Sequence, residues 1–253
     1  MKVFDTSLPD QISIEVVDYL RRIYHTLTIT GVCCGIGCAI QAYSRIGIYL
    51  TIIGFVLSFA LTIKLKFQLP TQDNSSQRLL IVHAIGLSLG LTIGPLVTYA
   101  FNIDDSIVPT ALMGSIAVFA SFSLSAFFAR RRSYLYIGGF LFSCLSILTI
   151  ISIINMFVQS LALYLIHLYG GLFLFCLYII YDTQKIIERA SNGYFDIAGD
   201  VLDLFLDFLN LFIKIVQLYI RSKMRNNNSN SNVSKSSFLT GGNGRKHNDL
   251  FDL

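Results

Sequence analysis

The chain has 253 residues, of which 54% are hydrophobic and only 13% are charged, and its mean hydropathy is +0.63. Because an ordinary soluble domain carries roughly 25% charged residues, this composition excludes that class and indicates an integral membrane protein in a lipid bilayer. The net charge of +4 comes largely from the chain ends and the loops. It therefore bears on orientation in the membrane, and no nucleic-acid partner is expected.

The first 22 residues are predicted to form a cytosolic N-terminal segment. They carry several charges and lack the short apolar core and small-residue cleavage site of a removable signal peptide. Seven apolar stretches follow, each about 20 residues long, which is enough to cross a hydrocarbon core of ~30 Å. They are residues 23–43, 46–63, 79–101, 107–129, 134–156, 161–181 and 197–220.

The polar breaks between these stretches are too short for an extramembrane domain. Residues 23–220 are therefore predicted to form one all-α membrane domain, a bundle of seven transmembrane helices. The segment 221–253 is rich in Asn and Ser and too polar to bury a core, so it is predicted to be a disordered tail.

Basic residues gather before the first stretch, between the second and third, and between the fourth and fifth. By the positive-inside rule this distribution places the N-terminus in the cytosol. Seven crossings then put the C-terminus on the far side, although the segment after residue 220 is also basic. The last stretch therefore either crosses the membrane despite its flanking charge or is re-entrant, and the sequence leaves both arrangements open.

Small residues predict close packing between two of the stretches. Glycines recur every four residues in the first stretch, at Gly31 and Gly35, and in the third, at Gly86, Gly90 and Gly94. The five cysteines also lie within apolar stretches. A reduced thiol packs there as a small hydrophobe, so no cysteine metal site is expected.

The last stretch carries a polar stripe that a lipid-facing helix would not carry. Asp203, Asp207, Asn210 and Lys214 follow one another at steps of four, three and four residues, the spacing that stacks side chains on one helical face. A charged group at the centre of a membrane helix costs roughly 2.5 to 3.5 kcal/mol on insertion scales. These four residues are therefore candidates for pairing or gating inside the bundle.

Asp182, just after the sixth stretch, is the expected partner for the acids of this stripe. If the last two stretches form a helical hairpin that turns near Gly193, Asp182 lies at the depth of Asp203 and Asp207 to within about a turn. The spacing does not choose between those two acids. Two carboxyl groups in contact at low dielectric tend to share one proton, and such a pair would act as a pH sensor.

Two cations are candidates for pairing with one of these acids. Lys214 lies farther along the stripe, and Arg78 lies at the mouth of the third stretch. The alternative is that the acids form salt bridges that only hold the helices together.

A pair of membrane aspartates also raises the possibility of an intramembrane aspartyl protease, which uses Tyr-Asp on one helix and Gly-x-Gly-Asp on the next. Tyr181-Asp182 fits the first element. The second element fails, because the nearest match, Ile197 to Asp200, lacks the first glycine. The chain is therefore not expected to be an enzyme.

Three segments carry a family resemblance. GPLVTYAFNIDDSIVPTALMGSIAVFASFSLSAFFARRRSYLYIGG (94–139), YDTQKIIERA (181–190) and DLFLDFLNLF (203–212) resemble the Bax inhibitor-1 branch of the transmembrane Bax inhibitor motif family. The resemblance covers roughly residues 20–220. It implies a protein of the endoplasmic reticulum membrane that suppresses cell death and lets Ca²⁺ leak from the store in a pH-dependent way.

By the same resemblance, the pH-sensing dyad maps onto Asp182 in YDTQ and Asp207 in LDFLNLF. Asp203 becomes a neighbour of the dyad, and Arg78 is similar to the basic residue that locks the gate. Ca²⁺ is expected as the permeant ion, with Asp182 and Asp207 as transient ligands, and no resident cofactor is expected. Apoptosis-regulating membrane proteins are the partners that the resemblance suggests. The alternative function is a non-conducting scaffold that restrains cell death by binding such partners.

Overall fold

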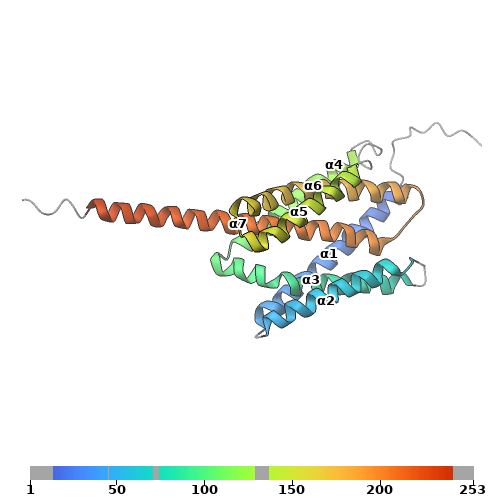
Figure 1. Ribbon diagram of the computed structural model, residues 1–253. Coiled ribbons are helices and arrows are strands. Elements are labelled where there is room, and N and C mark those ends of the chain that lie inside the picture. The colour runs from blue at the N-terminus through green and yellow to red at the C-terminus, as the bar shows by residue number, and fades with distance from the viewer. Residues whose placement is uncertain (1–13, 45, 71–73, 129–136, 242–253) are drawn as a thin grey trace, which may run out of the picture.

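A computed structural model describes residues 14–44, 46–70, 74–128 and 137–241, with side chains as far as residue 226. These residues form seven α-helices and no strand (Figure 1). The predicted all-α fold with seven helices is confirmed. The helices are α1 (Ile14–Tyr43), α2 (Gly47–Phe67), α3 (Ser75–Ile103), α4 (Ile107–Phe128), α5 (Gly138–Val158), α6 (Leu161–Ser191) and α7 (Ile197–Gly241).

Helices α1 to α6 are each long and apolar enough to cross a membrane, so the chain is a multi-pass membrane protein. Among the described helices α7 does not meet this criterion, because its charged stripe interrupts the apolar run. It continues without a turn from Ile197 to Gly241. The described part of the last stretch therefore contains no turn of the kind that a re-entrant arrangement would need.

Three helices extend beyond the apolar stretches that predicted them. α1 starts at Ile14 and not at residue 23, α6 ends at Ser191 and not at residue 181, and α7 continues to Gly241 and not only to residue 220. Hydropathy marks the part of a helix that lies in hydrocarbon, whereas a helix that has formed extends into polar sequence at little cost per residue. The predicted disordered tail is therefore helical as far as residue 241, and its remainder lies outside the described residues.

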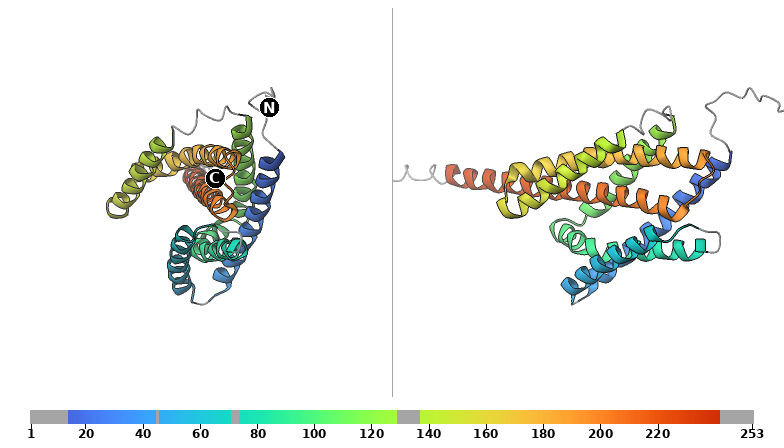
Figure 2. Two further views of the ribbon diagram at one scale, coloured as in Figure 1. Left: turned by 90° about the vertical axis from the view of Figure 1, so that its right-hand side faces the viewer. Right: turned by 45° about the vertical axis from the view of Figure 1, so that its right-hand side comes forward.

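The helix that carries the polar stripe lies inside the bundle. α7 packs against α1, α3, α4 and α6, and in the end-on view of Figure 2 it lies among them. Its side chains Leu202, Leu204 and Phe205 are at most 1% exposed. By contrast, Leu141 is the one buried side chain of α5. The stripe of α7 is thus enclosed by protein, while most of α5 is available to lipid.

Close contact between α1 and α3 depends on the glycines of α3. A Cβ added at Gly86, Gly90 or Gly94 would lie 2.7, 2.1 or 2.4 Å from the nearest atom of α1. The prediction of close packing on α3 is confirmed. On α1 the prediction is wrong, because a Cβ added at Gly31 or Gly35 would meet no atom within 4 Å.

The glycine of α1 that meets α3 is Gly37, where an added Cβ would lie 2.2 Å from the carbonyl oxygen of Leu87. A four-residue repeat of small residues marks a helical face. The repeat does not show whether a neighbouring helix covers that face. In this structure α3 covers the face of α1 that carries Gly37, not the face that carries Gly31 and Gly35.

Replacing Gly90 by Ala is expected to destabilise the bundle by about 1 to 3 kcal/mol, because the new methyl group would collide with the Cys34 carbonyl and force α1 and α3 apart. Thermal unfolding of the purified protein in detergent measures this loss. Gly35→Ala is the matched control, since it adds the same methyl group where there is open space. Equal unfolding temperatures for the two variants would show that the α1–α3 contact tolerates a methyl group.

Candidate functional site

A tight turn brings α6 and α7 side by side. α6 ends at Ser191, Gly193 has a left-handed φ of +79°, and α7 starts at Ile197. Glycine adopts this conformation without the steric penalty that a side chain would add. The backbone N–H of Gly193 donates to the carbonyl of Ala190 at 3.0 Å, which closes the turn. The predicted hairpin near Gly193 is confirmed.

The hairpin brings Asp182 of α6 and Asp207 of α7 together. Each carboxyl group is near enough to the other to be affected by its charge, and the two residues are only 7% and 6% exposed. Oδ2 of Asp207 is buried and receives no hydrogen bond from the described residues. A proton held between the two carboxyl groups would satisfy this oxygen.

Asp203 lies beside this pair and is held by two lysines. Lys66 Nζ of α2 is 2.8 Å from Oδ1 of Asp203, and Lys185 Nζ of α6 is 3.4 Å from Oδ2. Lys185 Nζ also lies 3.2 Å from Oδ1 of Asp182. Asp182 and Asp203 therefore each have an ammonium group as a neighbour, whereas no ion pair of the described residues includes Asp207.

Sequence reasoning missed Lys185, although its signal was present. Lys185 follows Asp182 by three residues, the spacing that places both side chains on one helical face. The sixth apolar stretch ends at residue 181, so hydropathy alone does not place Lys185 inside the bundle. The continuation of α6 to Ser191 brings Lys185 onto the same face as the dyad.

Arg78 does not pair with either acid of the dyad. Its guanidinium binds both carboxylate oxygens of Asp196, at 2.8 and 2.7 Å, and donates to the carbonyls of Leu65 and Gln68. Asp196 precedes α7, about 16 Å before Asp207 along the helix axis. Arg78 is 3% exposed and joins the end of α2 and the start of α3 to the α6–α7 turn.

Asp200 is a fully buried acid that the sequence did not single out. Its Oδ2 accepts a hydrogen bond from the hydroxyl of Tyr19 at 2.6 Å, and its Oδ1 lies 2.9 Å from Arg189. Tyr19 was missed because the predicted bundle began only at residue 23. Both carboxylate oxygens of Asp200 are thus occupied, and the carboxyl group that faces Asp182 belongs to Asp207.

The two remaining polar residues of the stripe bind partners outside the dyad. The side-chain amide of Asn210 donates to the carbonyl of Leu206 on its own helix at 2.8 Å. Lys214 Nζ lies 2.6 Å from Nε2 of His167 on α6. Among the ion pairs of the described residues, none involves Lys214. The predicted pairing of Lys214 with an acid is therefore not the arrangement in this structure.

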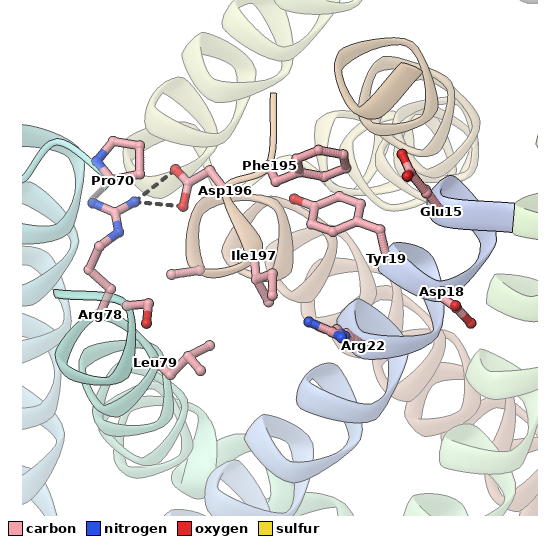
Figure 3. A pocket seen from close by; sticks show the side chains of 12 residues that line it. Glu15, Asp18, Tyr19, Arg22, Pro70, Arg78, Leu79, Phe195, Asp196 and Ile197 are labelled. Atoms are coloured by element: carbon pink, nitrogen blue, oxygen red, sulfur yellow. Dashed lines mark hydrogen bonds and ion pairs between the residues drawn. The ribbon is translucent and has the colours of Figure 1, made fainter. Parts of the chain in front are cut away.

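A cavity of about 630 Å³ lies at the end of the bundle where α6 turns into α7. Figure 3 shows the Arg78–Asp196 pair on one side of it and the rings of Tyr19 and Phe195 on the other, edge to face at 5.0 Å between centroids. This end also carries Lys66, beside Asp203. Asp196 lines the cavity, and Asp200, Asp203 and Asp207 follow along α7, away from this end of the bundle.

Within the described part of the chain, no group of three or more His, Cys, Asp or Glu side chains is arranged to hold a metal ion. The five cysteines are free thiols. The dyad offers two carboxyl groups, which is fewer oxygen ligands than the six to eight that a resident Ca²⁺ takes.

The chain has clear relatives. A family model described as inhibitor of apoptosis-promoting Bax1 matches residues 16–227. The chain is 34% identical to Bax inhibitor 1 of Drosophila melanogaster, with 81% of this chain and 83% of the relative covered. It is 34% identical to a probable Bax inhibitor 1 of Paralichthys olivaceus, with 82% and 90% covered. With the Homo sapiens Bax inhibitor 1 it shares 41% identity over 54% and 58% of the two chains. The family model and these relatives match most of this chain, which folds as a bundle of apolar helices around a polar α7. The chain therefore belongs to the Bax inhibitor 1 family of apoptosis inhibitors.

Proposed function

We propose that this protein suppresses apoptosis from the endoplasmic reticulum membrane as a pH-sensitive Ca²⁺ leak channel, with Asp182 and Asp207 as the sensor. The observation that supports the proposal is the burial of these two carboxyl groups near each other on neighbouring helices, with one oxygen of Asp207 lacking a donor among the described residues. The organelle follows from the family resemblance, and the basic loops favour a cytosolic N-terminus.

The proposed mechanism rests on the charge of the dyad. Lys185 stabilises the carboxylate of Asp182, so the shared proton is held mainly by Asp207. When that proton leaves, two negative charges face each other in a low-dielectric interior and repel. Ca²⁺ prefers carboxylate oxygens and relieves this repulsion as it passes. Protonation removes both the attraction for Ca²⁺ and the force that separates α6 from α7.

Flux measurements on purified protein in liposomes test this function. Ca²⁺ efflux is expected to rise as the pH is raised from 5 to 8, because deprotonation of the dyad creates the charge that draws Ca²⁺ into the bundle. Protein-free liposomes give the background leak. An efflux equal to that background, or one independent of pH, would contradict the proposal.

The salt bridges of the site support a second candidate function. Lys66, Asp203, Lys185 and Asp182 link α2, α6 and α7, which is what a purely structural network would do. In that case the protein would be a non-conducting scaffold that restrains cell death by binding membrane proteins. Deletion of residues 225–253 separates the two, because a channel core should still protect cells, whereas a scaffold that binds through its tail should not.

A further inference from the structure

A second buried polar pair lies farther along α7, on the same face as the dyad. Lys214 follows Asp207 by seven residues, about 10 Å along the helix, and returns to nearly the same angle. It is 6% exposed, and its one hydrogen-bond neighbour among the described residues is His167. An ion that moves along the stripe beyond the dyad therefore meets this pair next.

The surroundings show that α6 is shaped to receive Lys214. A Cβ at Gly171 would lie 2.8 Å from Cε of Lys214, so the missing side chain makes room for the lysine stem. His167 lies one turn before Gly171 on the same helix. These two residues of α6 together hold the ammonium group of Lys214 in one place.

The short contact restricts the charge of the pair. Two nitrogens 2.6 Å apart share one hydrogen, because two N–H groups would collide and two lone pairs would repel. An ammonium group that donates to a neutral imidazole satisfies this condition. In this form the ammonium charge is not neutralised, because no ion pair among the described residues includes Lys214.

We infer that Lys214, positioned by His167 and Gly171, is an electrostatic barrier that sets the preference of the pore between divalent and monovalent cations. The inference rests on the proposed ion path and adds a second control point to it. A fixed positive charge repels Ca²⁺ twice as strongly as it repels Na⁺ at the same distance. The dyad attracts the ion, and Lys214 limits how fast a divalent ion passes.

Ion flux through Lys214→Met in liposomes tests the barrier, because methionine keeps most of the length and loses the charge. Ca²⁺ flux at pH 7 is expected to rise on the order of tenfold and Na⁺ flux about threefold. The electrostatic barrier is proportional to the charge of the ion, so Na⁺ meets half the barrier that Ca²⁺ meets. Because flux depends exponentially on the barrier, the fold-increase for Na⁺ is the square root of the fold-increase for Ca²⁺. Lys64→Met is the matched control, because Lys64 is an exposed lysine of α2 outside the stripe, and it should leave both fluxes within about twofold. Equal factors for the two ions, or no change, would overturn the barrier.

A measurement on the unaltered protein covers the case in which Lys214→Met fails to fold. In ¹⁵N-histidine-labelled protein, the Nε2 resonance of His167, identified by its loss in His167→Gln, is expected at the position of a neutral nitrogen that accepts a hydrogen bond. An imidazolium resonance at pH 7 would overturn the inference, because a protonated Nε2 cannot accept from Lys214.

These results also separate the barrier from the proposed function. If Lys214→Met shows a pH-dependent Ca²⁺ leak with an unchanged ratio of Ca²⁺ to Na⁺ flux, the proposed barrier is wrong and the proposed channel function still holds. Absence of Ca²⁺ flux in the unaltered protein and in every variant contradicts the proposed channel, whereas an imidazolium resonance of His167 contradicts the proposed pairing with Lys214.

Discussion

Replacing Asp207 by Asn is expected to abolish the pH dependence of Ca²⁺ flux between pH 5 and 8. The amide keeps the size of the side chain but cannot ionise, so Asp182 keeps Lys185 as its neighbour and no proton is shared across the hairpin. Because Asp207 has no cation contact to lose, the unfolding temperature should stay close to that of the unaltered protein. Flux in liposomes at four pH values, together with thermal unfolding in detergent, measures both effects.

Asp203→Asn is the matched control for this experiment. It removes an acid one turn away that is already paired with Lys66 and Lys185 and whose side chain is 21% exposed. Its pH response should persist. The dyad is excluded as the sensor if Asp207→Asn titrates like the unaltered protein, or if both variants lose the response to the same degree.

Replacing Arg78 by Ala is expected to lower the free energy of unfolding by about 3 to 5 kcal/mol, the range measured when one partner of a buried ion pair is removed. Asp196 would lose both hydrogen bonds from the guanidinium, and the carbonyls of Leu65 and Gln68 would lose their donor. Side-chain exposures of 4% and 12% for Arg78 and Asp196 leave little access for water to compensate. Thermal unfolding in detergent measures the loss.

Arg22→Ala provides the comparison, because Arg22 lines the same cavity as Arg78 but is exposed. This substitution should change the free energy of unfolding by a few tenths of a kcal/mol at most. Asp196→Asn should fall between the two, because an amide oxygen still accepts from Arg78. Similar losses for Arg78→Ala and Arg22→Ala would mean that the ion pair does not stabilise the end of the bundle.

The proximity of Asp182 and Asp207 could be predicted from the sequence because it depends mainly on how far each residue lies from the turn along its helix. Once Gly193 is recognised as the turn, the rise per residue places Asp182 and Asp207 at similar depths, so that the two acids can approach each other. Choosing Asp207 over Asp203 needed the family resemblance, since the two acids differ by one turn. The structure gives the physical difference, which is that Asp203 is held by Lys66 from α2.

The partners of the other charged residues could not be predicted in this way, because they depend on which helix lies beside which. Nothing in the spacing of Arg78 says that α3 begins beside the α6–α7 turn, where Arg78 pairs with Asp196. Tyr19 and Asp200 are far apart in the chain and meet only because α1 starts nearer the N-terminus than hydropathy indicates. His167 lacked any sequence signal, since a single histidine in an apolar stretch does not reveal its neighbour.

The central position of α7 has a consequence for how the protein is made. α7 leaves the ribosome after α1 to α6, so the middle of the bundle is filled only once those six helices have been synthesised. Until then Lys66, Arg78, Lys185 and Arg189 lack the carboxylates of α7 and of the turn that precedes it. A chain interrupted before that turn therefore leaves four cations without those counter-charges.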